Sequence, residues 1–221
     1  MKKELIAMLT WHDVTVADAK EVFLSAKDAP TDHWGFKIEG TTPESMKELA
    51  NCMKENGKKV YIEMLAIDEK SCLEGAKLCV QCGAVDHVLG TVYFDSVADV
   101  LAEAGIAYSP FVGLADDARL RGSIDSIIEK ALEAEKKNIY GINLSAFRYA
   151  EGDPVELLEK LAPAVTKPFS IAGSVDCYEK MDVLKKLPNL YGFTIGGAFF
   201  EKKFGETFAE QITKVVEYMA E

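Results

Sequence analysis

The sequence alternates between short apolar runs and amphipathic segments, and this alternation constrains the fold more than any other feature. The apolar runs are rich in Val, Ile, Phe and Tyr, and the segments between them span about 10–17 residues. Such an alternation is typical of successive βα units and predicts a parallel sheet. The predicted strands are 4–11, 33–39, 59–66, 86–92, 106–112, 139–146, 167–172 and 190–195.

The intervening segments carry the start and stop signals of helices. Thr42-Pro43 and Asp153-Pro154 each place a capping residue before a proline, which needs no hydrogen-bond acceptor in the first helical turn. Gly57, Gly83 and Gly105 stand just before the third, fourth and fifth strands, where a left-handed helix C-cap favours glycine. No linker or change of composition interrupts the repeat, so residues 1–221 are predicted to form one domain.

Eight βα units in 221 residues can form either a closed barrel or an open doubly wound sheet. A dinucleotide-binding open sheet would place a glycine-rich turn after the first strand. Here the first strand runs into Thr10-Trp11-His12-Asp13, without a glycine. The sequence therefore predicts an α/β fold, a single (β/α)8 TIM barrel, although the chain is short for a fold that typically needs about 250 residues.

Composition excludes several classes of protein. The formal net charge of −11 argues against nucleic-acid binding, because such proteins usually present a basic face. No apolar stretch approaches the roughly 20 residues that cross a bilayer, so no membrane segment is expected and the location is predicted to be cytoplasmic. The five cysteines are odd in number, which disfavours a disulfide framework. The Cys79/Cys82 pair has no second pair beside it and is read as thiols packed near a helix end.

Glycines gather after the last two strands. The seventh strand ends in Ile171-Ala172-Gly173-Ser174, and the eighth in Thr194-Ile195-Gly196-Gly197-Ala198-Phe199. Barrel enzymes often hold a phosphate between these two loops, with a short helix after the eighth strand. Glycine lets the backbone N–H groups approach the anion closely. Gly173, Ser174, Gly196 and Gly197 are therefore predicted to bind phosphate, with tight turn geometry as the alternative explanation.

The pairing of AGS after the seventh strand with TIGGAFF after the eighth resembles the phosphate-binding barrels typified by ribulose-phosphate-binding enzymes. This superfamily includes ribulose-phosphate epimerase, orotidine-monophosphate and keto-gulonate-phosphate decarboxylases, and related aldolases. The resemblance implies the barrel fold and an anion site. Two departures leave the reaction open: the Asp-x-Lys signature of the decarboxylases is missing from the third strand, and Gly141-Ile142-Asn143-Leu144 holds no Schiff-base lysine on the sixth.

Alternation along the strands predicts which side chains enter the barrel. Phe36 and Ile38 on the second strand suit the helix layer, which turns Lys37 and Glu39 inward. The same reasoning turns Glu63 inward on the third strand and Asn143 inward on the sixth. The following residues are also predicted to point inside: Ser145, Ser170 and Thr194.

Lys37 and Glu63 lie on neighbouring strands and are the predicted catalytic pair, because catalytic residues in this fold come from the carboxyl ends of several strands. They would transfer protons or polarise a carbonyl; a Schiff-base role for Lys37 is an alternative. A purely structural buried ion pair is another. No cofactor and no metal is predicted to be required, although Glu39, Glu63 and Asp68 offer the oxygen ligands that a divalent cation prefers.

Further polar residues follow the predicted strands. Glu39, Asn143 and Arg148 are predicted to bind substrate, with Arg148 as a clamp for a carboxylate or phosphate. The loop 113–123 is long enough to form a lid, and its arginines, Arg119 and Arg121, either reach a second anionic group or are solvated.

Histidines stand at both ends of the predicted barrel. His12 and Asp13 follow the first strand, where they suit acid–base work, although Asp13 suits helix capping equally well. His33 and His87 begin their strands at the opposite face, where stabilising roles prevail.

The sequence thus predicts an enzyme acting on a small phosphorylated metabolite, a sugar phosphate or keto-acid phosphate. The reaction expected is that of a lyase or isomerase, with proton transfer next to a carbonyl. The alternatives are a phosphoribosyl-handling enzyme and a non-catalytic phosphate-binding or regulatory barrel. The expected partner is the phosphorylated substrate, and a homo-oligomer is compatible with a barrel of this size.

Overall fold

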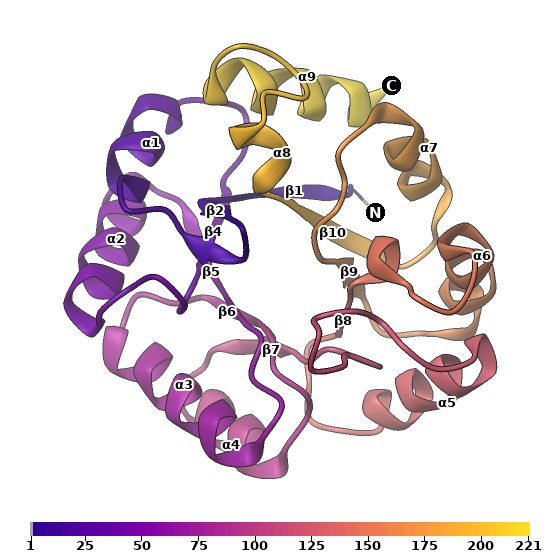
Figure 1. The fold of residues 1–221 in the computed structure, drawn as a ribbon. Helices are drawn as coiled ribbons and strands as arrows, with labels where there is room; N and C mark the ends of the chain where they lie inside the picture. Colours follow the sequence, from indigo (N-terminus) through magenta and orange to yellow (C-terminus); the bar gives the residue numbers. More distant parts are fainter. Residues whose placement is uncertain (1) are drawn as a thin grey trace.

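Eight parallel strands form the barrel of this computed structural model, which describes residues 2–221 (Figure 1). The sheet order is β7-β6-β5-β4-β1-β10-β9-β8, and a bridge between Phe111 and Asn143 joins its two edges. The barrel strands are β1 (Glu4–Met8), β4 (His33–Lys37), β5 (Lys59–Met64), β6 (His87–Gly90), β7 (Ala107–Ser109), β8 (Ile142–Leu144), β9 (Phe169–Ile171) and β10 (Leu190–Ile195). The predicted single (β/α)8 barrel is confirmed.

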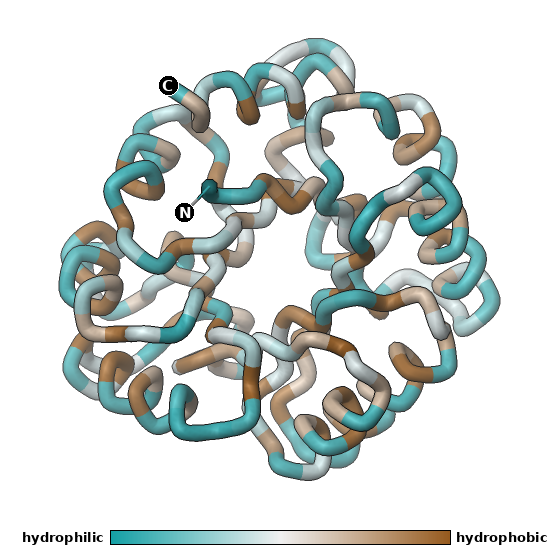
Figure 2. The backbone as a smooth tube through the Cα atoms, turned by 180° about the vertical axis from the view of Figure 1, so that it is seen from behind, coloured by the Kyte–Doolittle hydropathy of each residue, from teal (hydrophilic) through white to brown (hydrophobic). Residues whose placement is uncertain are grey.

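Helices surround the barrel on all sides in Figure 1, as the amphipathic segments predict. They are α1 (Ala19–Ala26), α2 (Pro43–Glu55), α3 (Glu69–Cys82), α4 (Asp95–Glu103), α5 (Ile124–Glu135), α6 (Pro154–Ala164), α7 (Tyr178–Lys186), α8 (Gly197–Phe200) and α9 (Phe208–Ala220). Figure 2 shows hydrophobic and hydrophilic stretches alternating along these helices. The hydrophobic stripes bury the main core between helices and strands.

The predicted helix signals operate as expected. Thr42 caps α2 in a reciprocal capping box with Ser45, and Asp153 caps α6. Gly83 ends α3 in the left-handed conformation with a φ of 72°. These local signals fix the lengths of the connections, and therefore the order in which the strands meet.

Seven of the eight predicted strands are shorter than expected, all but 190–195, and two of these differences matter to the site. The run 4–11 divides, because β1 ends at Met8 and the chain then enters a hairpin of β2 (Thr10–Trp11) and β3 (Val14–Thr15). The run 139–146 is a strand only over β8, and a short 3-10 helix, η1 (Ala146–Arg148), follows it. Both departures lie at the carboxyl end of the barrel.

The amino-terminal end of the barrel interior is filled by neutral side chains. Ile6, Met8, Tyr61, Leu89 and Tyr191 form a separate buried cluster in the interior, which extends as far as Met8, the last residue of β1. His87 packs beside it, stacks on both tyrosine rings and hydrogen-bonds the Ser109 hydroxyl at 2.8 Å. His33 hydrogen-bonds the Tyr61 hydroxyl, also at 2.8 Å. Both histidines lie at the amino-terminal ends of their strands, as predicted, and their stabilising role stays a prediction.

Two further predictions from composition, on the cysteines and on membrane segments, can be compared with the structure. Cys79 and Cys82 are free, buried thiols at the end of α3, as predicted. In the part of the chain that the structure describes, no helix combines the length and apolar character needed to cross a bilayer.

Candidate active site

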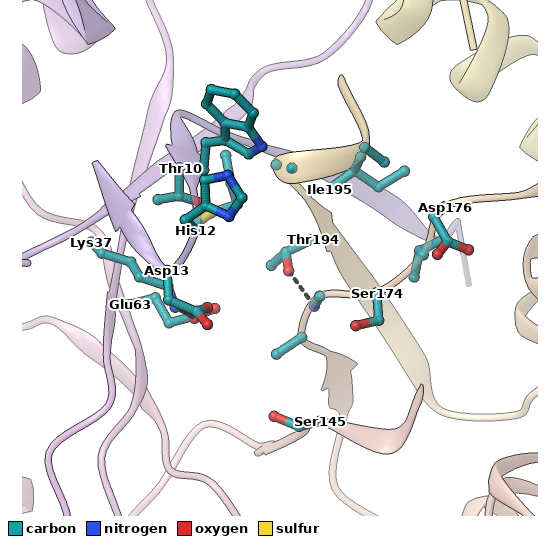
Figure 3. A pocket seen from close by; sticks show the side chains of 18 of the residues that line it. Thr10, His12, Asp13, Lys37, Glu63, Ser145, Ser174, Asp176, Thr194 and Ile195 are labelled. Carbon is teal, nitrogen blue, oxygen red and sulfur yellow. Dashed lines mark hydrogen bonds and ion pairs between the residues drawn. The ribbon is translucent and has the colours of Figure 1, made fainter. Parts of the chain in front are cut away.

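A cavity of about 300 Å³ opens at the carboxyl ends of the strands, on the face where barrel enzymes carry their chemistry. In Figure 3, Asp13, Lys37 and Glu63 lie on one side of this cavity, and Ser174 and Asp176 lie on the other. The strands β1, β4, β5, β9 and β10 and the loops that follow them supply most of its lining. The site therefore has a charged side and a glycine-rich side.

Lys37 and Glu63 form the pair that the strand alternation predicts. The register of β4 and β5 sets the two residues directly opposite each other, and Lys37 Nζ lies 2.9 Å from Glu63 Oε1. Their side chains are only 4% and 7% exposed, yet both line the cavity. A buried pair of this kind is costly unless it is fully hydrogen-bonded or used.

Asp13, a candidate for acid–base work from the sequence, completes the charged side and is the main residue whose ion pairs sequence reasoning missed. Its carboxylate accepts a hydrogen bond from Lys37 Nζ at 2.8 Å. It does not cap the first helix, because Asp18 stands at that cap. The β2–β3 hairpin brings Asp13 over the barrel, whereas strand alternation alone gives no position for a residue beyond the strand end.

The ion pairs keep these groups charged. Burial by itself would lower the pKa of Lys37, but the carboxylates of Glu63 and Asp13 outweigh it and raise that pKa. Burial likewise opposes ionisation of Asp13, and the cations Lys37 and Arg148 nevertheless lower its pKa to about 2. These ion pairs favour the ammonium form of Lys37, whereas a Schiff-base nucleophile reacts as the neutral amine.

Arg148 lies at the cavity, as predicted, and joins its two sides. Its guanidinium donates to both oxygens of Asp13, at 3.2 and 3.3 Å. Its Nε donates to the Ser174 hydroxyl at 3.2 Å. Because η1 ends at Arg148, the irregular segment after β8 is what turns this side chain over the cavity.

The glycine-rich side consists of the loops after β9 and β10. Gly173 and Ser174 both have positive φ angles, of 67° and 57°, and Gly173 N–H donates to the Thr194 hydroxyl at 2.8 Å. Among residues 2–221, the N–H groups of Ser174, Gly197 and Ala198 donate to no protein acceptor, although all three residues line the cavity. Unpaired backbone donors that converge in this way can bind an anion.

The two glycines after β10 have different steric surroundings. A Cβ at Gly196 would lie 2.7 Å from the Thr10 carbonyl oxygen, which no side chain can tolerate without a shift. A Cβ at Gly197 would contact only Trp11, at 3.7 Å. Glycine is therefore required by packing at 196, whereas at 197 it leaves space in the cavity.

Lys180 is a second residue that sequence reasoning missed. Its ammonium donates to the Ser174 carbonyl at 2.7 Å and pairs with Asp176 at 2.8 Å. It thereby neutralises an acidic residue at the cavity rim. Its position four residues after Asp176, at helical spacing, is a signal that could have indicated the pair.

Two of the predicted substrate-binding residues do not line the cavity. Asn143 points inside the barrel, as the alternation predicts, but it is fully buried, hydrogen-bonds Ser170 at 2.8 Å and does not line the cavity. Glu39 does not line the cavity either, because β4 ends at Lys37 and the chain then turns away through Gly40. Lys37 pairs with Asp13 in place of Glu39.

The three carboxylates of the alternative metal site do not come together. Asp68 caps α3 through the Ser71 N–H, and Glu63 is held by Lys37, so these carboxylates do not gather with Glu39. No group of three or more His, Cys, Asp or Glu side chains within residues 2–221 is arranged to hold a metal ion.

The loop 113–123 packs beside the segment that carries Arg148. Leu120 is buried and exchanges backbone hydrogen bonds with Arg148 and Ala150. Arg121 pairs with Asp117 on the surface, and neither it nor Arg119 lines the cavity. Of the two alternatives for these arginines, the solvated one agrees with the structure.

Solved structures resemble this chain over its full length. Orotidine 5'-monophosphate decarboxylase from Methanocaldococcus jannaschii, in complex with the inhibitor BMP, superposes with a TM-score of 0.76 at 17% identity, covering 100% of both chains. Orotidine 5'-phosphate decarboxylase from Pyrococcus horikoshii OT3 gives a TM-score of 0.72 at 13% identity, covering 98% of this chain and 99% of the other. The chain has the fold of these phosphate-binding barrels.

Orotidine-monophosphate decarboxylases belong to the superfamily that the glycine motifs resemble, so the fold implied by that resemblance is confirmed. At these identities the likeness concerns the fold alone. No protein-family model and no curated protein sequence matches the chain.

Proposed function

We propose that this protein is an enzyme that acts on a small phosphorylated metabolite, as a lyase or isomerase that forms a carbanion or enediolate next to a carbonyl. One observation carries the proposal. A single cavity combines unpaired backbone N–H groups on one side with a buried, carboxylate-bound ammonium ion on the other. The first feature suits a phosphate and the second suits a reacting carbonyl.

The phosphate would bind at Gly173, Ser174, Gly196 and Gly197. The N–H groups of Ser174, Gly197 and Ala198 supply donors, and Arg148 adds a cation that already contacts Ser174. This local supply of positive potential matters because the chain as a whole carries a formal charge of −11. An anionic substrate needs such a site to overcome the repulsion of an acidic surface.

Lys37 would polarise the carbonyl of the substrate. Its ammonium can stabilise the negative charge that develops on the carbonyl oxygen when a carbanion or enediolate forms. Glu63 and Asp13 hold the ammonium in place and in its charged form. Proton transfer and charge stabilisation of this kind use side chains alone, so we expect no cofactor to be required.

A phosphoribosyl compound is the second candidate substrate. The names of the similar solved structures favour it, because orotidine 5'-monophosphate carries a phosphoribosyl group. The decarboxylation itself is not expected here, since β5 ends in Glu63-Met64 and Leu65 follows, so the lysine of the Asp-x-Lys signature is missing.

The test is a screen of the purified protein against phosphorylated sugars, phosphorylated keto acids and phosphoribosyl compounds. A ligand whose concentration is 100 times its dissociation constant should stabilise the protein by about 2.7 kcal/mol, which raises the melting temperature. Compounds that bind are then incubated with the protein in D₂O, and NMR follows C–H exchange and product formation.

If the protein is an enzyme, we expect turnover or C–H exchange of at least one compound that binds. Lys37→Met should remove that activity while binding persists, and the double variant Lys37→Met/Glu63→Gln serves as a check because it leaves no unpaired buried charge. A protein that binds compounds but neither exchanges nor converts any of them would instead be a binding or regulatory barrel.

A further inference from the structure

The hairpin at the cavity mouth has an unusual turn. Trp11 pairs with Val14, so His12 and Asp13 are the two central residues of a two-residue hairpin loop. Both have positive φ, 51° and 62°, as a type I′ turn requires. Such turns favour Asn-Gly because glycine adopts positive φ without strain, yet this turn contains no glycine. Strained backbone of this kind often marks a functional site.

The turn places the side chains of His12 and Asp13 at the cavity, in different surroundings. Asp13 is held by Lys37 and Arg148. The exposed His12 ring also lines the cavity and stacks on Trp11, with 4.5 Å between ring centroids. Within residues 2–221, His12 has no side-chain hydrogen bond or ion pair. Figure 3 shows its ring at the cavity, on the barrel side of the hairpin that carries Asp13.

The other titratable groups of the cavity are engaged in ion pairs. Lys37 holds Asp13 and Glu63, and Arg148 holds Asp13. At the rim, Asp176 pairs with Lys180, and Glu201 with Lys203. A group that shuttles protons must be free to gain and lose one, and imidazole is the side chain best suited to this near neutral pH. Among the cavity residues that the structure describes, His12 is the one imidazole, and its ring makes no side-chain hydrogen bond or ion pair.

We propose that His12 is a further catalytic residue, the acid–base group that carries the proton to and from the carbon next to the substrate carbonyl. The inference rests on the proposed function and assigns the base that it leaves open. The neutral imidazole nitrogen takes the proton from carbon, the C–H electron pair forms the C=C bond of the enediolate, and the carbonyl oxygen takes the negative charge beside Lys37 Nζ. The imidazolium then returns the proton to carbon.

The turn geometry provides matched variants. His12→Asn and His12→Gly both suit a positive φ and remove the imidazole, so neither should lower the melting temperature. Each is assayed with the panel compound that the wild type exchanges or converts fastest. We expect kcat to fall by at least about 100-fold, the usual range for loss of an acid–base group. The melting-temperature rise caused by that compound should persist, because the phosphate contacts are intact.

Exogenous imidazole separates a chemical role from a structural one. In His12→Gly, added imidazole should restore part of the activity in proportion to its concentration, whereas His12→Asn offers less space for it. Activity of His12→Asn within threefold of the wild type would overturn the inference while leaving the proposed function intact. If the wild-type protein neither converts nor exchanges any compound of the panel, that result would contradict the proposed function, and this inference with it.

Discussion

The two ends of the barrel interior both contain titratable side chains but treat them in opposite ways. At the amino-terminal end, His87 is buried among tyrosines, and burial lowers its pKa to about 3. Burial also raises the pKa values of Tyr61 and Tyr191. At the carboxyl end, the pKa of Lys37 is raised and that of Asp13 is lowered. One end keeps its groups neutral, whereas the other keeps them charged.

The difference follows from the partners that each end supplies. The ring of His87 contacts a hydroxyl and aromatic rings, and desolvation lowers its pKa more than the nearby Asp86 raises it. Lys37 has two carboxylates within 2.9 Å, which outweigh desolvation. Charge retained at such a cost, at the face where this fold carries its chemistry, is what the proposed function requires.

Removing one charge from the carboxyl end should have the largest effect. Lys37→Met leaves Glu63 buried and unpaired, and we expect it to lower the free energy of unfolding by about 3–5 kcal/mol. Urea denaturation at pH 7 measures this change. Adding Glu63→Gln should restore much of the stability, and a double variant no more stable than Lys37→Met would contradict the ion-pair explanation.

The neighbouring glycines after β10 sharpen the comparison within the carboxyl end. Gly196→Ala should lower the free energy of unfolding by about 1–3 kcal/mol, because its Cβ meets the Thr10 carbonyl oxygen. Gly197→Ala should change it by no more than about 1 kcal/mol, since its Cβ makes only an ordinary contact. Thermal unfolding of both variants tests this, and equal losses would show that the two positions are not distinguished by packing.

The neutral end predicts a specific dependence of stability on pH. The folded pKa of His87 lies below its unfolded value of 6.5, so the unfolded state binds the proton first as pH falls. Stability is therefore lost below pH 6.5, by about 1.5 kcal/mol between pH 6.5 and 5. The lowered pKa of His33 acts in the same direction. His87→Phe should flatten the dependence of stability on pH, and an unchanged slope would refute the assignment of that dependence to His87.

Asp13 affects stability only at lower pH, because its stabilisation is present above pH 3.8 and is lost as pH falls towards 2.

An exposed ion pair should matter least. Arg121 and Asp117 pair on the surface outside the cavity, so Arg121→Ala should change stability by less than about 1 kcal/mol. The Arg121→Ala variant should bind inorganic phosphate as tightly as the wild type. The Arg148→Ala variant should bind phosphate about tenfold more weakly. Calorimetric titration of phosphate into both variants compares these affinities. An equal loss of affinity in the two variants would show that Arg148 does not contribute to the phosphate site.

Local patterns predicted the fold and the strand-borne part of the site. Alternation placed Lys37 opposite Glu63 because both lie within regular strands. It gave the correct inward direction for Asn143, which is fully buried and does not line the cavity, and it could not place Glu39, which lies beyond the end of β4. Periodicity gives the direction of a side chain but not its height along the barrel.

Residues beyond the strand ends were the least predictable. The place of Asp13 depends on a hairpin whose turn carries neither of the usual residues, and Arg148 depends on η1. Glycine motifs were more informative, because Gly173 and Gly196 are required by a positive φ and by a close backbone contact that few other residues allow.

The most direct test of the phosphate site is calorimetric titration of inorganic phosphate into Gly197→Asp and Gly197→Asn. The two side chains have nearly the same shape, and the space at Gly197 admits either, but only aspartate brings a negative charge to the unpaired N–H groups. We expect the asparagine variant to bind phosphate and the aspartate variant to bind at least tenfold more weakly, a difference of about 1.4 kcal/mol. Equal affinity in the two variants, or no binding to the wild type, would contradict a phosphate site at this end of the barrel.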